Sequence, residues 1–312
     1  MNEAQLVTRV RELFSPRIAD DAAVVDGQAL TTDMLIEDVD FTRATPLRFV
    51  ARKALAVNLS DLAAMGASPA YALIAIGLPE WAYANVDELL TSFASAAKEH
   101  AIEIVGGDFS RADKLTIAIT AIGRVTRPLL RSGAKPGDRI YLSRPVGGAG
   151  AGLALIGRDL SAQSFVVREF ASSAIARHLD PEPEVALGLA LAKIDQVTAC
   201  IDVSDGFSTD LHHLCDASHC GAEIERERIP LFPDLITHGA ALGIPVRDVV
   251  MNGGEEFALL FTSSLRESEM SVRVGRPVYS IGRITSARDV VIKGQGPLEP
   301  RGFDHFRMPD RS

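Results

Sequence analysis

The 312-residue sequence contains little cysteine and no excess of positive charge. Its three cysteines are Cys200, Cys215 and Cys220, and so small and odd a number argues against a disulfide framework and favours a reducing cytoplasm. Lys and Arg total 32 against 41 Asp and Glu, which gives a formal net charge of −9. Because an acidic chain gains nothing from a phosphate backbone, nucleic acid is not an expected partner.

Long apolar runs and nucleotide-binding motifs of common type are also missing. No apolar stretch reaches the roughly 18 residues that span a bilayer, so no membrane association is expected. Charges are spread through residues 2–14, and this predicts an amphipathic helix and not a signal peptide. Aromatic residues make up 6% of the chain, too few for a stacking ladder for bases. No G-x-x-x-x-G-K-[ST] sequence occurs, which excludes a Walker-type phosphate loop.

Strand and helix signals mix in both halves of the chain. Asp26-Gly27 predicts a hairpin between strands near 22–25 and 29–32, and Pro46 begins a helix that ends near Met65. The loop at 131–138, rich in Gly, Pro and charge, is the expected boundary between residues 1–135 and 136–312. The fold class is therefore two domains of α/β and α+β type, and not a doubly wound sheet. Further strands are expected near 71–78, 102–105, 114–125, 139–143, 197–203, 258–262, 278–284 and 290–292, and further helices at 86–99, after the glycine-rich turn, after Pro183 and at 208–217.

Seven aspartates stand at the ends of segments whose composition predicts burial. A buried carboxylate without a partner is costly, and few Lys or Arg lie beside these residues in the sequence. Carboxylate oxygen is the ligand that Mg²⁺ prefers, usually shared with a substrate phosphate, and Thr31, Thr32, Ser60 and Ser204 add hydroxyl oxygens. Together they indicate a magnesium site. The aspartates are Asp20, Asp21, Asp33, Asp61, Asp108, Asp202 and Asp205.

Each aspartate also has a purely structural interpretation. Asp61 would pair with Arg52 or Lys53, one or two turns earlier on the same helix. Asp202 and Asp205 would cap the helix that follows them. Asp108, after two glycines, would be a turn residue. The functional interpretation rests on the seven occurring together.

Other motifs are weaker. Glycines beside carboxylates at 106–108 and 253–256 permit close approach of a ligand. The glycine-rich stretch at 147–152 does not have G-x-G-x-x-G spacing, so it predicts a helix N-terminus built for packing or for phosphate. His and Cys residues between 212 and 220 lack the spacing of a structural zinc site, which favours a structural interpretation.

Eight ordered segments carry a family resemblance: ADDAAVV, LTTDML, ARKALAVNLSDLAAMGASP, IVGGD, RSGAKPGD, IDVSDG, GGEEFALLFT and GFDHF. The chain resembles the thiamine-monophosphate kinase family, which is related to aminoimidazole ribonucleotide synthetase, selenophosphate synthetase and the hydrogenase-maturation dehydratase. The resemblance implies an N-terminal α/β domain that dimerises and a C-terminal α+β domain. It implies phosphorylation of thiamine monophosphate to thiamine diphosphate by direct transfer from ATP with several Mg²⁺ ions, in a homodimer.

Site residues follow from the same resemblance. Asp33, Asp61 and Asp205 are the expected catalytic residues. Asp40, Glu255 and Phe303 are the expected contacts with thiamine monophosphate. The expected ATP contacts are Gly107, Asp108, Arg131 and Ser204. The expected metal ligands are Asp20, Asp21, Thr31, Thr32, Asp33, Asp61, Asp108, Asp202 and Asp205.

The sequence departs from the family pattern mainly on the acceptor side. Ala19 replaces a glycine before the paired aspartates, Asp40 replaces a histidine, and Glu256-Phe257-Ala258 replaces Asp-Tyr-Glu. A carboxylate at position 40 would repel an acceptor phosphate unless a metal intervened. Two alternatives therefore stay open: the same Mg-ATP chemistry on another anionic small molecule, and a non-catalytic nucleotide-binding relative. The intact aspartates argue against the second.

Overall fold

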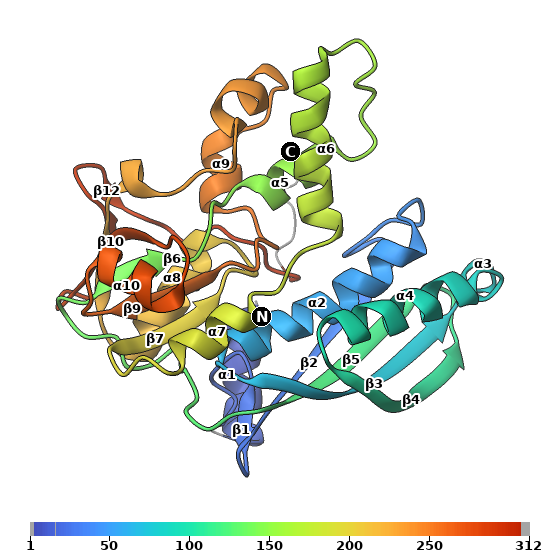
Figure 1. Ribbon diagram of the computed structural model, residues 1–312, viewed down its shortest axis with the longest axis horizontal. Helices are drawn as coiled ribbons and strands as arrows, with labels where there is room; N and C mark the ends of the chain where they lie inside the picture. Colours follow the sequence, from blue (N-terminus) through green and yellow to red (C-terminus); the bar gives the residue numbers. More distant parts are fainter. Residues whose placement is uncertain (1–2, 16, 307–312) are drawn as a thin grey trace.

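The computed structural model describes residues 3–15 and 17–306, and it contains two β-sheets with a long helix between them (Figure 1). The first sheet has five strands in the order β1-β2-β5-β3-β4. Strands β3 and β4 are parallel, and the other neighbours are antiparallel. The strands are β1 (Ala23–Val25), β2 (Gln28–Ile36), β3 (Ser68–Leu78), β4 (Glu103–Arg111) and β5 (Thr116–Arg124). The helices of this half are α1 (Glu3–Leu13), α2 (Leu47–Ala64), α3 (Glu80–Tyr83) and α4 (Val86–Glu99).

The second sheet has seven strands in the order β12-β11-β8-β10-β6-β9-β7. Helices α5, α6 and α9 form a lobe that projects at the top of the molecule in Figure 1. The strands are β6 (Arg139–Leu142), β7 (Val197–Asp202), β8 (Gly221–Ile224), β9 (Leu259–Ser263), β10 (Tyr279–Thr285), β11 (Val290–Ile292) and β12 (Gly296–Pro297). The helices are α5 (Gly148–Leu155), α6 (Phe165–Leu179), α7 (Val185–Leu191), α8 (Phe207–Ser218), η1 (Arg226–Arg228), η2 (Leu235–Gly239), α9 (Val246–Met251) and α10 (Glu267–Val274).

Helix α2 positions the site because it packs against both halves of the molecule. It contacts β2 and β5 of the first sheet and α7 and β7 of the second half. Most of its residues are buried, including the polar residues Lys53, Asn58 and Ser60. A helix that is covered on all sides exposes no polar face, so each of these polar side chains must find its partner inside the protein.

Most predicted elements are confirmed, among them the hairpin at Asp26-Gly27 and the helix after Pro46. The predicted buried strand at 102–105 extends to Arg111 as β4, and it is largely exposed because it forms the edge of its sheet. Several elements were not predicted: the long helix α6, whose sequence has no clear apolar stripe, and the shorter elements α3, β8, α9, α10 and β12. Residue 2 of the predicted N-terminal helix lies outside the described residues. No helix among the described residues is both long and apolar enough to cross a membrane.

Candidate active site

Three carboxylates converge between the two sheets. Asp21 lies just before β1, Asp61 in the last turn of α2 and Asp202 at the end of β7. One oxygen from each lies within 4.8 Å of the others. Asp33, from β2, lies close enough to Asp61 for the two carboxyl groups to affect each other's pKa. We call Asp21, Asp33, Asp61 and Asp202 the carboxylate cluster.

Burial and mutual repulsion act on the protonation of this cluster. Desolvation by burial raises the pKa of Asp202 to about 8 and that of Asp33 to about 6. Desolvation, followed by repulsion from Asp33, raises the pKa of Asp61 well above its ordinary value. For Asp21, desolvation outweighs the opposing attraction of Arg131, and the pKa is raised. Four acids so placed need added positive charge to be ionised together.

Hydroxyl, amide and guanidinium groups surround the cluster. Thr31 Oγ1 donates to Asp61, and Ser60 Oγ donates to Asp202 at 2.5 Å. Arg131 binds Asp21 through a 2.6 Å contact from its guanidinium, while its backbone N–H donates to Asp20 at 2.8 Å. These contacts hold the oxygens in place but leave Asp21 Oδ2 buried without a hydrogen-bond partner among the described residues.

The structural interpretation of Asp61 is wrong. Arg52 pairs with Asp180 at 2.6 Å and with Glu99 at 2.9 Å, and Lys53 pairs with Glu255 at 2.5 Å. Neither cation reaches Asp61, whose contacts are with Thr31 and Asp33. Asp61 therefore lacks the lysine or arginine partner that an ordinary buried aspartate would have, while Arg131 pairs with Asp21 in the same cluster.

Two expected ligands lie on the opposite face of the first sheet. Strand alternation buries the Thr31 side chain and points that of Thr32 outward, where its hydroxyl meets Thr120 Oγ1 at 2.7 Å. Asp108 is exposed on the edge strand β4, in register with Ala75, which is also exposed. Beside it, a Cβ on Gly107 would lie 1.8 Å from the carbonyl oxygen of Ile74, so close strand packing is one reason for glycine there.

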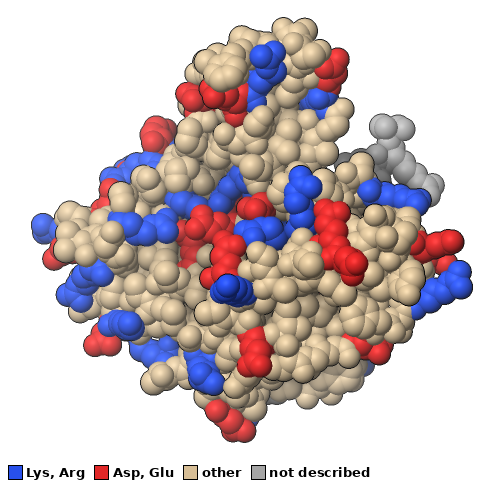
Figure 2. Space-filling view, turned by 45° about the vertical axis from the view of Figure 1, so that its right-hand side comes forward, with Lys and Arg blue, Asp and Glu red and all other residues tan. Residues whose placement is uncertain are grey.

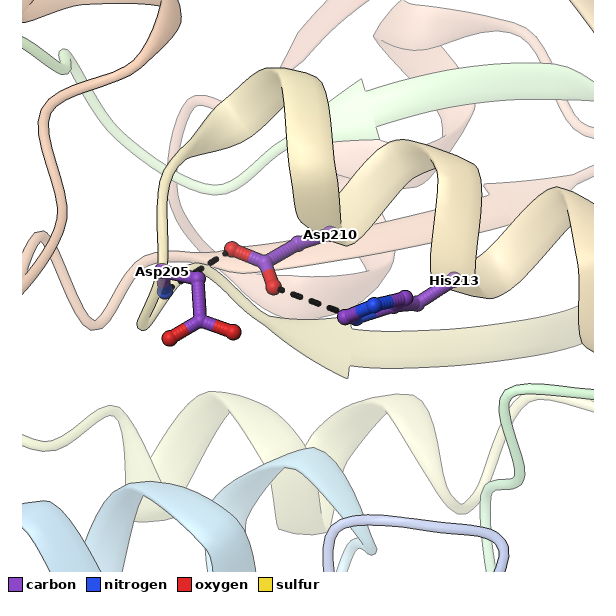
Figure 3. Close-up of side chains that lie close together, drawn as sticks. All are labelled: Asp205, Asp210 and His213. Carbon is purple, nitrogen blue, oxygen red and sulfur yellow. Dashed lines mark hydrogen bonds and ion pairs between the residues drawn. The ribbon is translucent and has the colours of Figure 1, made fainter. Parts of the chain in front are cut away.

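Asp205 occupies the loop between β7 and α8, close to two residues of that helix (Figure 3). Asp210 accepts the backbone N–H groups of Asp205 at 3.2 Å and of Gly206 at 3.0 Å. It is thus Asp210, and not Asp202 or Asp205, that binds these amides at the start of α8. His213 Nδ1 lies 3.8 Å from Asp210, and burial lowers the His213 pKa to about 4. Ser204, one of the expected ATP contacts, accepts the backbone N–H of Glu255 through its carbonyl oxygen at 2.7 Å.

A cavity of about 360 Å³ lies between the segment 35–53 and the projecting lobe. Its walls are largely apolar, and Asp40, Lys53 and His178 also line it. Asp40 accepts the N–H of Ile36 at 2.7 Å, and burial raises its pKa. Figure 2 shows acidic and basic side chains side by side across the middle of the face below the lobe. We call this cavity the acceptor pocket; it is lined by Leu35, Asp38, Val39, Asp40, Phe41, Thr42, Thr45, Phe49, Val50, Lys53, Leu153, Ile156, His178 and Leu179.

The other departures from the family pattern lie in the protein interior. Phe257 and Ala258 are 4% and 0% exposed and do not line the acceptor pocket. Glu256 accepts the backbone N–H groups of Gly147 and Ala149 at 2.7 and 2.9 Å. Its carboxylate fills the glycine-rich helix N-terminus, which supports the packing interpretation of that turn. Position 40 is therefore the altered position that faces the pocket.

Sequence reasoning did not single out Lys53, His178 or Asp210. A signal for Lys53 was available, since it is a charged residue within an apolar stretch of α2 and on the same helix as Asp61. His178 and Asp210 carry no local signal, because their partners Glu255 and Asp205 come from distant or irregular segments. Phe303 lies near Asp205, whose carbonyl oxygen accepts the Phe303 N–H at 2.9 Å.

Comparison with known proteins identifies the family. Residues 19–125 match the N-terminal domain of AIR synthase related proteins, and residues 135–294 match the C-terminal domain. Thiamine-monophosphate kinase of Rhodopirellula baltica is 33% identical, over 97% of this chain and 95% of that protein. The Escherichia coli K12 protein of the same name is 35% identical, over 94% of this chain and 92% of its own length.

A solved structure of AaThiL complexed with AMPPCP and TMP has the same fold. It superposes with a TM-score of 0.88 at 31% identity, and the match covers 98% of this chain and 97% of that one. Both domains of the present chain are therefore AIR synthase-like, with mixed α/β structure. By sequence and by fold, the chain belongs to the thiamine-monophosphate kinase family.

Proposed function

We propose that this protein is an ATP-dependent kinase that phosphorylates thiamine monophosphate to thiamine diphosphate. Relatives named for this activity match nearly the whole chain, and a structural neighbour binds an ATP analogue together with TMP. The observation that carries the proposal is the carboxylate cluster: four acids meet between the two sheets, with no lysine paired to any of them among the described residues. Phosphoryl transfer between two phosphates needs cations, which a group of carboxylates can bind, and it needs little covalent chemistry from the protein.

The donor set fits Mg²⁺. Asp21 Oδ2 is buried without a partner, and the raised pKa values mark oxygens short of positive charge. Bound there, Mg²⁺ would neutralise the phosphates and align donor with acceptor. The residues that would hold the ions from this chain are Asp20, Asp21, Thr31, Asp33, Asp61, Asp202 and Asp205.

The protein's own groups orient the reactants. Asp21 fixes the Arg131 guanidinium, which is suited to bind an ATP phosphate. Asp33, Asp61 and Asp205 would place the transferring group, so the reaction is direct and needs no protein nucleophile. The Asp40 carboxylate is anchored to the backbone N–H of Ile36 at the end of β2. Ile36 is three residues beyond Asp33, or roughly 10 Å along the strand. Asp40 would therefore face the ring end of the acceptor and not its phosphate, with Glu255 and Phe303 nearby.

We propose a homodimer that forms through the outer face and edge of the first sheet. Met34 and Leu73 are 52% and 43% exposed there, and Val105 and Phe109 on β4 are 52% and 58% exposed. Exposed apolar side chains on an edge strand favour association with another chain. The same face carries Thr32 and Asp108, so dimerisation would bring these expected ligands, with Gly107, toward the nucleotide of a neighbouring subunit.

Dimerisation is tested by sedimentation of the wild type and of the Leu73→Asp variant. We expect a dimer for the wild type and a monomer for the variant. A wild-type monomer at micromolar concentration would contradict the proposal.

We further propose a cytoplasmic location, supported by three buried free thiols, and a domain boundary near residue 135, between β5 and β6.

The activity is tested by incubating the protein with ATP, Mg²⁺ and thiamine monophosphate and by separating the products by chromatography. Thiamine and an acceptor-free mixture serve as controls. We expect thiamine diphosphate only with the monophosphate. If the fold is stabilised by Mg-ATP but no thiamine diphosphate forms, the acceptor is a different molecule.

A further inference from the structure

A buried charged triad, Lys53, Glu255 and His178, joins the two halves of the molecule at the acceptor pocket. Lys53 comes from α2, His178 from α6 and Glu255 from the loop before β9. Lys53 Nζ lies 2.5 Å from one carboxylate oxygen of Glu255, and His178 Nδ1 lies 3.0 Å from the other. Each oxygen of a single carboxylate is thus held by a nitrogen from a different half.

The triad is built into the interior. Lys53 and His178 are 3% and 4% exposed, while the Glu255 side chain is 27% exposed and reaches solvent. Buried lysine is rare unless its charge is paired, and a buried ion pair adds little net stability compared with apolar side chains. The burial of the Lys53–Glu255 ion pair beside a pocket therefore indicates a role other than stabilising the fold.

The backbone at Glu255 is held in an unusual conformation. Its φ of +62° lies in the left-handed region, which a residue with a side chain rarely adopts. Its N–H donates to the carbonyl oxygen of Ser204 at 2.7 Å, in the loop that carries Asp205. A Cβ on the preceding Gly254 would lie 2.6 Å from that same oxygen. The loop that contains Glu255 is therefore packed tightly against the loop that carries Asp205. The Glu255 carboxylate points back toward Lys53 on α2.

The triad also sets the protonation state of the Glu255 carboxylate. Burial alone would raise the pKa of Glu255, but the hydrogen bond from His178 and the charge of Lys53 together lower it below its usual range. Glu255 thus stays ionised at neutral pH. The Lys53 ammonium group is 3.5 Å from the backbone carbonyl oxygen of Asp40, so it also contacts the segment that forms the pocket wall.

We infer that Lys53 and His178 are positioning residues that fix the Glu255 carboxylate for binding of the phosphorylated acceptor. The inference rests on the proposed function and extends it to two residues. Lys53 and His178 line the acceptor pocket but are almost fully buried, whereas the Glu255 carboxylate that both of them hold is partly exposed, so we assign their effect to Glu255. Binding of ATP at the carboxylate cluster should not depend on them.

The test compares KM for thiamine monophosphate and for ATP in Lys53→Met, His178→Leu, His178→Gln and Glu255→Gln variants. We expect Lys53→Met to raise the acceptor KM about tenfold, equivalent to about 1.4 kcal/mol, with the ATP KM within twofold. His178→Gln retains a donor and should recover most of the affinity that His178→Leu loses. Since Lys53 acts through Glu255, Glu255→Gln and the Lys53→Met/Glu255→Gln double variant should share one acceptor KM.

Two matched controls separate positioning from domain docking. Arg52→Met breaks the neighbouring ion pair with Asp180, which also joins the two halves, and Lys293→Met removes a surface lysine paired with Glu225. Both should leave the acceptor KM within twofold. Melting temperatures identify any variant that fails to fold, and the two His178 variants then test the triad from the other half.

The inference is overturned if Lys53→Met and His178→Leu both fold and leave the acceptor KM unchanged. It is also overturned if ATP KM rises as much as acceptor KM, or if Arg52→Met has the same effect as Lys53→Met. A wild-type protein that makes no thiamine diphosphate contradicts the proposed function itself. The two failures are therefore distinguishable.

Discussion

The carboxylate cluster and the acceptor pocket both contain buried charge, but they balance it differently. In the cluster, Asp61 and Asp202 have raised pKa values and no lysine partner. In the triad beside the pocket, Glu255 is paired with Lys53 and His178, and its pKa is lowered. The first region needs positive charge from outside, whereas the second is neutralised within the chain. This difference supports the proposal that the first region binds the nucleotide with its cations and that the second binds the acceptor through fixed contacts.

The largest effect is expected from removing a carboxylate of the cluster. Asp61→Asn should lower kcat by at least about 10³-fold, because fixed electrostatic groups at a reacting centre contribute on this scale. Loss of one repelling charge should also raise the melting temperature in the absence of Mg²⁺. Steady-state kinetics and calorimetry measure the two effects. A variant that is less stable without Mg²⁺ would show that the cluster is not short of positive charge.

The second prediction concerns stability and pH. The Asp202 pKa is about 8 in the folded protein against an ordinary value of 3.8, so the folded state binds more protons than the unfolded state between these values. Stability contributed by the proton is present at low pH and is lost as pH rises through this window. Urea unfolding in EDTA should therefore give a lower free energy at pH 8 than at pH 5. Mg²⁺ with ATP should largely abolish the decline, and a decline of equal size with Mg-ATP would contradict the account.

A smaller effect is expected at position 40. Asp40→Asn should raise the KM for thiamine monophosphate several-fold and leave the ATP KM unchanged, because a half-buried carboxylate contributes modestly to binding a cationic thiazolium ring. Substrate titrations at fixed Mg-ATP measure it. An unchanged or lower acceptor KM would show that the carboxylate does not contact the ring.

The smallest catalytic effect is expected at Phe257. Because its side chain is buried and does not line the pocket, Phe257→Tyr should leave both KM values within twofold. An unpartnered buried hydroxyl should lower the free energy of unfolding by about 1–3 kcal/mol. Denaturant unfolding checks the stability change. A changed acceptor KM would mean that position 257 influences the acceptor after all.

The cluster could be predicted from sequence, and the triad could not, for a physical reason. Aspartates next to apolar strands, such as Asp33 and Asp202, show in the local sequence that a carboxylate will be buried. The pairing of Lys53 with Glu255 joins residues about 200 positions apart, and no local pattern reports it. The same limit left open the structural alternative that Asp61 pairs with Arg52 or Lys53, which the structure contradicts.

The same distinction between local and tertiary signals decides which parts of the fold can be predicted from sequence. Strands with clear alternation, such as β5, and helices with a proline start, such as α2, were predicted. The exposure of β4 depends on its place at the edge of a sheet, which is a tertiary property. The side-chain direction of Thr32 and the outward position of Asp108 depend on register in the same way.

The most direct test measures thiamine diphosphate formation by the wild type, Asp61→Asn and Lys53→Met over a wide range of thiamine monophosphate at saturating Mg-ATP. We expect saturating acceptor to restore Lys53→Met to nearly the wild-type rate and no acceptor concentration to restore Asp61→Asn. A Lys53→Met enzyme that stays slow at saturation, or an Asp61→Asn enzyme rescued by acceptor, would contradict the division between the two regions.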